Sequence, residues 1–170
     1  MLSRTIQKFI CMMCDDCCFF KQEEDMPIVF YWEKERLSEY GSSMGVKLRF
    51  KDFLTVDDGK EKFTYLYRWV IDGKCPFLRD NLCIIHKDKP LSCKIYPLIV
   101  EVPESRIHVS ARCKWVESNM ENIDPQDVPQ IFDEFKIAVS MLAMVLKFMD
   151  IAKQNGWKII LHRDIIPQKV

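Results

Sequence analysis

Four of the eight cysteines in this 170-residue chain lie within eight residues, in the run Cys11-x2-Cys14-x2-Cys17-Cys18. The remaining four are spaced more widely along the chain: Cys75, Cys83, Cys93 and Cys113. Thiolates are soft ligands, and a dense cluster with spaced thiols that fold back onto it is typical of a site for a thiophilic metal. We therefore expect all eight cysteines to be metal ligands.

The sequence before Cys11 lacks the apolar segment that forms the core of a secretory signal peptide. We therefore expect a cytoplasmic protein, in which the reducing surroundings keep cysteines as thiols or thiolates. The alternative reading, four disulfides in an exported protein, requires an export signal that the start of the sequence does not show.

The charges of the chain balance, with 25 basic and 25 acidic residues. This balance offers no electrostatic argument for a nucleic acid or an anionic membrane as partner, and we expect neither. The apolar segment 137–146 is much shorter than the roughly 20 residues that a membrane span needs, and charged residues flank it closely. It predicts a buried helix.

Alternating apolar and polar residues predict strands in two segments, 46–51 and 63–71. The Asp-Asp-Gly-Lys sequence at 57–60 predicts a hairpin between them. A second hairpin is expected around 103–106, and a late strand at 157–162.

Two helices are expected, one at 28–40 ended by Gly41 and a longer one at about 125–155. Together with the strands they predict an α+β fold. In this fold a small sheet, hairpins and loops are organised around a cysteine metal cluster, and the long C-terminal helix packs on them. The length fits one domain over residues 1–170.

The steps of three residues between Cys11, Cys14 and Cys17 are those of the first three ligands in bacterial ferredoxins. This spacing favours an iron–sulfur cluster, of the 4Fe-4S type, over the alternative of zinc. Adjacent side chains of an extended backbone point in opposite directions. We therefore expect Cys11, Cys14 and Cys17 to share one centre, while Cys18 points toward the later cysteines. The alternative is that Cys17 or Cys18 is a free thiol available for chemistry.

The sequence contains few motifs of other kinds of functional site. His86, between Cys83 and Cys93, is a candidate ligand or a neighbour of one, and the alternative is an ordinary turn histidine. No dinucleotide-binding, P-loop, nucleophile-elbow or zinc-protease motif is found, so no catalytic residue is assigned.

The combined blocks of the sequence resemble the CxxCxxCC cysteine-cluster proteins, also called the YkgJ-type family. The resemblance covers about residues 5–116 and continues beyond the first cysteines in three blocks: Cys75-Pro76-Phe77-Leu78, Cys83-Ile84-Ile85-His86 and Lys89-Pro90-Leu91-Ser92-Cys93-Lys94-Ile95-Tyr96-Pro97. Three positions depart from the usual pattern: His86 stands for Tyr, Lys89 for Arg, and Tyr96 for Phe.

This resemblance implies a zinc- or iron-chelating domain. One branch of the family resembles flagellin lysine N-methylases, which are thought to use an iron–sulfur cluster and S-adenosylmethionine. Two alternatives to a simple metal-binding protein therefore stay open. One is a cluster-dependent enzyme for redox or methyl-transfer chemistry, and the other is a structural metal module that binds a protein partner.

Overall fold

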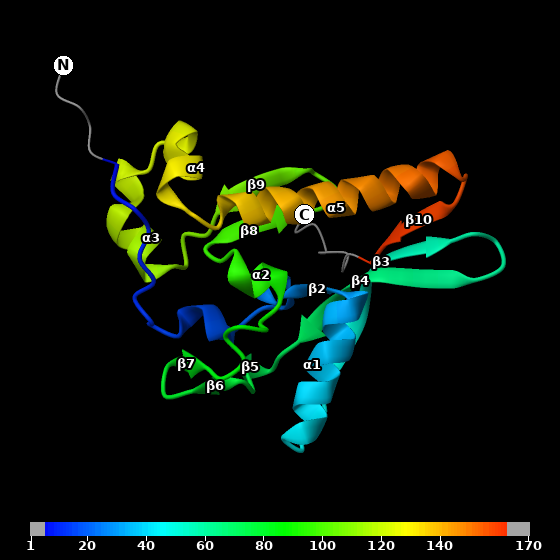
Figure 1. Cartoon of the computed structure of the whole chain (residues 1–170), viewed down its shortest axis with the longest axis horizontal. Helices are drawn as coiled ribbons and strands as arrows, with labels where there is room; N and C mark the ends of the chain where they lie inside the picture. The colour runs from blue at the N-terminus through cyan, green and yellow to red at the C-terminus, as the bar shows by residue number, and fades with distance from the viewer. Residues whose placement is uncertain (1–5, 163–170) are drawn as a thin grey trace, which may run out of the picture. The chain divides into compact units, whose positions relative to one another are not determined.

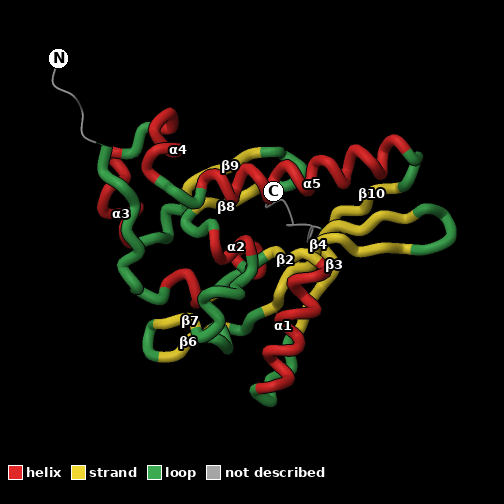
Figure 2. The backbone as a smooth tube through the Cα atoms, in the orientation of Figure 1, coloured by secondary structure: helices red, strands yellow, loops and turns green. Residues whose placement is uncertain are grey.

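The computed structural model describes residues 6–162. The chain divides into two compact units, which we call the cysteine unit (Met1–Asp25 and Asp72–Leu146) and the sheet unit (Met26–Ile71 and Lys147–Val170). Helices and small antiparallel sheets occur together (Figures 1 and 2), which confirms the α+β prediction. The expectation of one domain over residues 1–170 stays a prediction.

The cysteine unit contains all eight cysteines and is built from short elements joined by turns. Its strands form three two-stranded antiparallel sheets: β1 (Phe19–Phe20) with β5 (Gly73–Lys74), β6 (Leu78–Arg79) with β7 (Leu82–Cys83), and β8 (Leu98–Glu101) with β9 (Arg106–Val109). The β8–β9 pair confirms the hairpin predicted around 103–106. Its helical segments are η1 (Asp16–Cys18), η2 (Glu23–Asp25), α2 (Leu91–Lys94), α3 (Lys114–Asn119), η3 (Met120–Asn122), η4 (Pro125–Asp127) and α4 (Val128–Ile131).

An aromatic cluster holds the start of the chain against the later helices of this unit. The Phe9 ring packs edge-on against Trp115 of α3, with centroids 5.4 Å apart, and also contacts Phe132 at 5.4 Å. The Phe9 N–H donates to the Ile131 carbonyl at 2.9 Å. The N-terminal segment, blue in Figure 1, therefore runs past α3 and α4.

The sheet unit is organised by a four-stranded antiparallel sheet in the order β10-β3-β4-β2. Its strands are β2 (Ile28–Phe30), β3 (Arg49–Asp57), β4 (Lys62–Val70) and β10 (Lys158–Leu161). The β3–β4 hairpin closes where Asp57 pairs with Lys62, as predicted, and Gly59 takes a φ of 88° that favours glycine. The late strand is confirmed as β10, which pairs with β3.

The predicted helix at 28–40 is wrong at both ends. Residues 28–30 form strand β2, which pairs with β4, and helix α1 covers Tyr31–Ser43. The buried Glu33 carboxylate accepts from the Phe30 N–H at 3.0 Å and so begins the helix after the strand. Gly41 lies inside α1, where a Cβ would stand 2.6 Å from the Val46 carbonyl oxygen.

The long C-terminal helix is confirmed, but it begins ten residues later than predicted. Helix α5 covers Phe135–Gln154 and is preceded by η4 and α4. The chain becomes extended at Phe132, which is fully buried, and this break separates α4 from α5. Near the other end of α5, Phe148 stacks on Tyr65 of β4 with centroids 3.8 Å apart. Among residues 6–162, no helix has the length and apolar character needed to cross a bilayer.

Candidate metal centre

The CxxCxxCC run forms a loop that ends in the 3-10 turn η1. Met13 and Asp15 take left-handed backbone angles, with φ of 49° and 62°. The Cys18 N–H donates to the Asp15 carbonyl at 2.7 Å, which closes the turn. Because this backbone is a turn, the thiols of Cys17 and Cys18 are not directed apart: their sulfurs are 3.9 Å apart and hydrogen-bonded. The expectation of diverging side chains, which assumed an extended chain, is wrong.

Cys75 is brought beside Cys18 by the short β1–β5 ladder. Phe19 pairs with Lys74 and Phe20 with Gly73 in this antiparallel pair. One step further, the Cys75 N–H donates to the Cys18 carbonyl at 2.8 Å. The Cys75 thiol also raises the pKa of the Cys18 thiol. The loop at the start of the chain is thus joined to the first of the later cysteines.

Local turns place the next two cysteines. The Leu78 N–H donates to the Cys75 carbonyl at 3.1 Å, and Leu78 then pairs with Cys83 across the β6–β7 hairpin. Cys93 lies in the single turn of α2, where its N–H donates to the Pro90 carbonyl at 3.0 Å. These turns return the chain toward Cys18.

Each of five thiols affects the pKa of another or is affected by it, and we call them the five-cysteine group: Cys17, Cys18, Cys75, Cys83 and Cys93. The hydrogen bond with Cys18 raises the pKa of Cys17 well above its usual range. Burial raises the pKa of Cys93, and the charges of Cys18, Cys17 and Cys83 add to this effect. The hydrogen bond with Cys17 lowers the pKa of Cys18. The interaction with the Cys75 thiol, burial and the charges of Cys75 and Cys83 outweigh this effect and raise the pKa to about 12.

The charge of Lys89 acts on three thiols of this group. The Lys89 ammonium lowers the pKa of Cys17, Cys83 and Cys93, against the larger effects that raise these values. A positive charge favours the thiolate form, which is the form that ligates metals. Ser92, next to Cys93, has a buried hydroxyl oxygen without a hydrogen-bond partner among residues 6–162.

The other three thiols form a three-cysteine group: Cys11, Cys14 and Cys113. Cys113 is buried immediately before α3, while Cys11 is exposed and Cys14 is partly buried. Burial raises the pKa of Cys113, the N–H groups of Val116 and Trp115 lower it, and the charges of Cys14 and Cys11 raise it. The charge of Cys17 thus raises the pKa of the later Cys83 and Cys93, and the charges of Cys11 and Cys14 act on Cys113, which differs from the predicted grouping.

In both groups the cysteines are free thiols. Across residues 6–162, no three His, Cys, Asp or Glu side chains meet closely enough to hold a metal ion as they stand. The donor chemistry nevertheless fits a soft metal, since every member is a thiol and the thiols repel one another when ionised. Binding would therefore release protons and draw sulfurs together.

His86 is exposed on the turn after Cys83, and its N–H donates to the Cys83 carbonyl at 3.1 Å. Its position supports the interpretation of His86 as an ordinary turn histidine.

Two neighbours of the thiols were given no role from the sequence. Tyr96 interacts with both Cys113 and Cys17, and burial raises its pKa to about 12. Arg112 donates to the Phe19 carbonyl at 2.8 Å.

Comparison with known proteins agrees with the cysteine pattern. The family CxxCxxCC, described as "Putative zinc- or iron-chelating domain", matches residues 10–119, well over half of the chain. This range contains all eight cysteines. Neither a curated protein nor a solved structure matches the chain.

Proposed function

Because the chain belongs to the CxxCxxCC family of zinc- or iron-chelating domains, we propose that it is a metal-binding protein in which cysteine thiolates are the ligands. The ligands proposed are the five-cysteine group and the three-cysteine group, which together include Cys11, Cys14, Cys17, Cys18, Cys75, Cys83, Cys93 and Cys113. The observation that carries the proposal is the convergence of Cys17, Cys18 and Cys75, from two distant segments, at one place.

Zinc is the metal that this geometry supports best. A tetrahedral zinc with Zn–S bonds of about 2.3 Å separates two of its sulfurs by about 3.8 Å. The sulfurs of Cys17 and Cys18 are 3.9 Å apart before any metal is bound. Both thiolates therefore fit one ion with little movement, and Cys75 together with Cys83 or Cys93 would complete four ligands.

An iron–sulfur cluster, of the 4Fe-4S type, is the second candidate. Each iron of a cubane takes one thiolate, so a cluster needs four thiolates around a larger volume than one zinc does. The ferredoxin-like spacing of Cys11, Cys14 and Cys17 in the sequence favours a cluster. The short separation of the Cys17 and Cys18 sulfurs favours zinc.

Purification under anaerobic conditions with analysis of metal and acid-labile sulfide tests the proposal. Colourless protein with stoichiometric zinc and no sulfide supports zinc, and brown protein with matching iron and sulfide supports the cluster. Cys18→Ser should lose most of the metal, whereas Ser43→Ala, at the exposed end of α1, should retain it. Wild-type protein that retains neither metal after reconstitution would refute the proposal.

A further inference from the structure

The thiols of Cys17 and Cys18 form an adjacent pair in η1, the turn that ends the CxxCxxCC loop. Their sulfurs are 3.9 Å apart and hydrogen-bonded. Adjacent side chains of an extended strand point in opposite directions, so this turn is what brings the two sulfurs together. An S–S bond is about 2.05 Å long, so an approach of about 1.9 Å would join them. The pair is therefore placed for oxidation to a disulfide.

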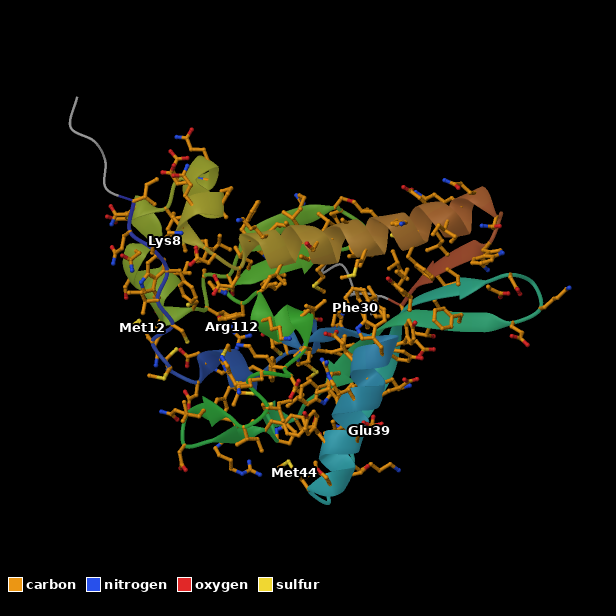
Figure 3. All side chains as sticks on the ribbon, viewed as in Figure 1. Lys8, Met12, Phe30, Glu39, Met44 and Arg112 are labelled. Atoms are coloured by element: carbon orange, nitrogen blue, oxygen red, sulfur yellow. The ribbon has the colours of Figure 1, made fainter. Side chains whose placement is uncertain are left out.

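Hydrogen bonds hold the backbone of Cys18 on both sides. Its N–H donates to the Asp15 carbonyl at 2.7 Å, and its carbonyl accepts from the Cys75 N–H at 2.8 Å. The carbonyl of the next residue, Phe19, accepts from Arg112 at 2.8 Å (Arg112 is labelled in Figure 3). These bonds keep the second sulfur of the pair in a defined position beside the first.

Cys17 is the member of the pair that a small oxidant reaches first. It is exposed, whereas Cys18 is partly buried and Cys75, the other neighbour of Cys18, is buried. The charge of Lys89 acts on Cys17, and a cation near the reacting sulfur attracts an anionic oxidant. Ligation to the proposed metal keeps both sulfurs as thiolates, which is the form that attacks a disulfide.

We infer that Cys17 and Cys18 are a redox switch for the proposed metal site, in which a small anionic disulfide such as oxidised glutathione joins the two sulfurs and displaces them from the metal. The inference rests on the proposed function, because it adds a means of regulation to the same ligands. Metal would be held while the pair is reduced and released when the pair is oxidised.

The reaction is two successive thiol–disulfide exchanges. The Cys17 thiolate attacks one sulfur of the oxidant, which forms a mixed disulfide and expels one glutathione thiolate. The Cys18 thiolate then attacks the Cys17 sulfur, which forms the Cys17–Cys18 bond and expels the second glutathione. The two cysteines lose two electrons to the oxidant, and the two expelled thiolates take up protons from solvent. The metal loses two ligands in the same process.

The disulfide of such a pair is easily reduced again. Consecutive Cα atoms are about 3.8 Å apart across a trans peptide, which is less than the roughly 4.4–6.8 Å that disulfides usually span. Strained disulfides have more oxidising potentials and are labile or regulatory rather than structural. A dithiol reductant therefore restores both ligands, and the metal binds again.

Treatment of zinc-loaded, full-length protein with oxidised glutathione tests the switch. A coloured chelator measures zinc release, and mass spectrometry after alkylation of free thiols identifies the oxidised cysteines. The peptide that contains Cys17 and Cys18 should lose two hydrogens and escape alkylation, in parallel with zinc release. Dithiothreitol should reverse both changes after its removal and the return of zinc.

Two variants separate the steps of the reaction. Cys18→Ser lacks the second nucleophile, so Cys17 should remain as a mixed disulfide with glutathione. Cys83→Ser retains the pair and should still form the Cys17–Cys18 disulfide. Zinc-loaded protein that keeps its zinc and its free thiols, or in which Cys18 is linked to Cys75 instead, would overturn the switch and leave the proposed metal binding intact. Wild-type protein that binds no zinc would overturn both.

Discussion

The N–H of Cys75 donates to the carbonyl oxygen of Cys18 at 2.8 Å, so two cysteines that lie far apart in the sequence become neighbours through their backbones. The Cys75 thiol also raises the pKa of the Cys18 thiol. The ladder that produces this contact contains only two strand residues on each side, Phe19–Phe20 and Gly73–Lys74. Such a short pair is marginal by itself, and a metal held by the same two cysteines would stabilise it.

Removal of the metal should therefore loosen the cysteine region first. We expect amide exchange at residues 6–25 and 75–115 to accelerate by more than about tenfold after complete chelation, because the ligands lose their shared bond. The β3–β4 hairpin and helix α5 should change much less. Hydrogen exchange followed by mass spectrometry, with and without chelator, measures both regions. Unchanged exchange at 75–115 would contradict the prediction.

Metal-free, reduced protein should lose stability as the pH rises above about 9. In the folded state the pKa of Cys18 rises from the ordinary 9.0 to about 12. Between these values the folded chain keeps a proton that the unfolded chain releases, so its stabilising contribution is present below pH 9 and lost toward pH 12. Urea midpoints across this range measure the effect. The decline should be shallower in Cys18→Ser, and a parallel decline in both proteins would count against it.

The sequence predicted those elements whose signals are local. The turn at 57–60 and the aromatic alternation after it predicted the β3–β4 hairpin, because both features are contained in one short segment. The segment Ile28–Phe30 was assigned to a helix because Asp25-Met26-Pro27 before it is typical of a helix start. It became strand β2 by pairing with β4, a contact that no local pattern reveals.

The grouping of the thiols could not be predicted for the same reason. Which sulfurs meet depends on the β1–β5 ladder and on Phe9 packing against Trp115, and both are contacts between distant parts of the chain. By contrast, the prediction that all eight cysteines are metal ligands needed only their residue type and spacing. The break at Phe132, which divides the predicted C-terminal helix, also follows from distant packing, because this ring is buried against Phe9 and Trp115.

Gly41→Ala should destabilise the protein by about 2 kcal/mol, although alanine normally favours a helix interior. The added Cβ would stand 2.6 Å from the Val46 carbonyl oxygen, and Val46 itself donates to the Gly41 carbonyl at 2.8 Å. Denaturant unfolding measures the change. The neighbouring Ser42→Ala is the control and should change the free energy of unfolding by no more than about 0.5 kcal/mol. Equal stabilities of the two variants would refute the steric argument.

Arg112→Met should destabilise the cysteine unit by about 1 kcal/mol. It removes the ion pair with Asp25 and the bond to the Phe19 carbonyl, which together hold the end of the CxxCxxCC loop. Arg106→Met is the matched control, since Arg106 pairs with Glu101 across an exposed hairpin. The Arg112 variant should also show faster amide exchange at 15–20. If both variants lose the same stability, the bridging role of Arg112 is wrong.

Lys89→Met should weaken zinc binding by about tenfold at neutral pH. The ammonium of Lys89 favours the thiolates of Cys17, Cys83 and Cys93, so its removal raises their pKa values and makes each bound metal displace more tightly held protons. Competition with a coloured chelator measures the affinity, and Lys87→Met, at an exposed position two residues away, is the control. The deficit of the Lys89 variant should shrink as the pH rises, because the thiols then ionise without help from the lysine. A deficit that stays constant from about pH 7 to about pH 9 would mean that Lys89 contributes by packing rather than by charge.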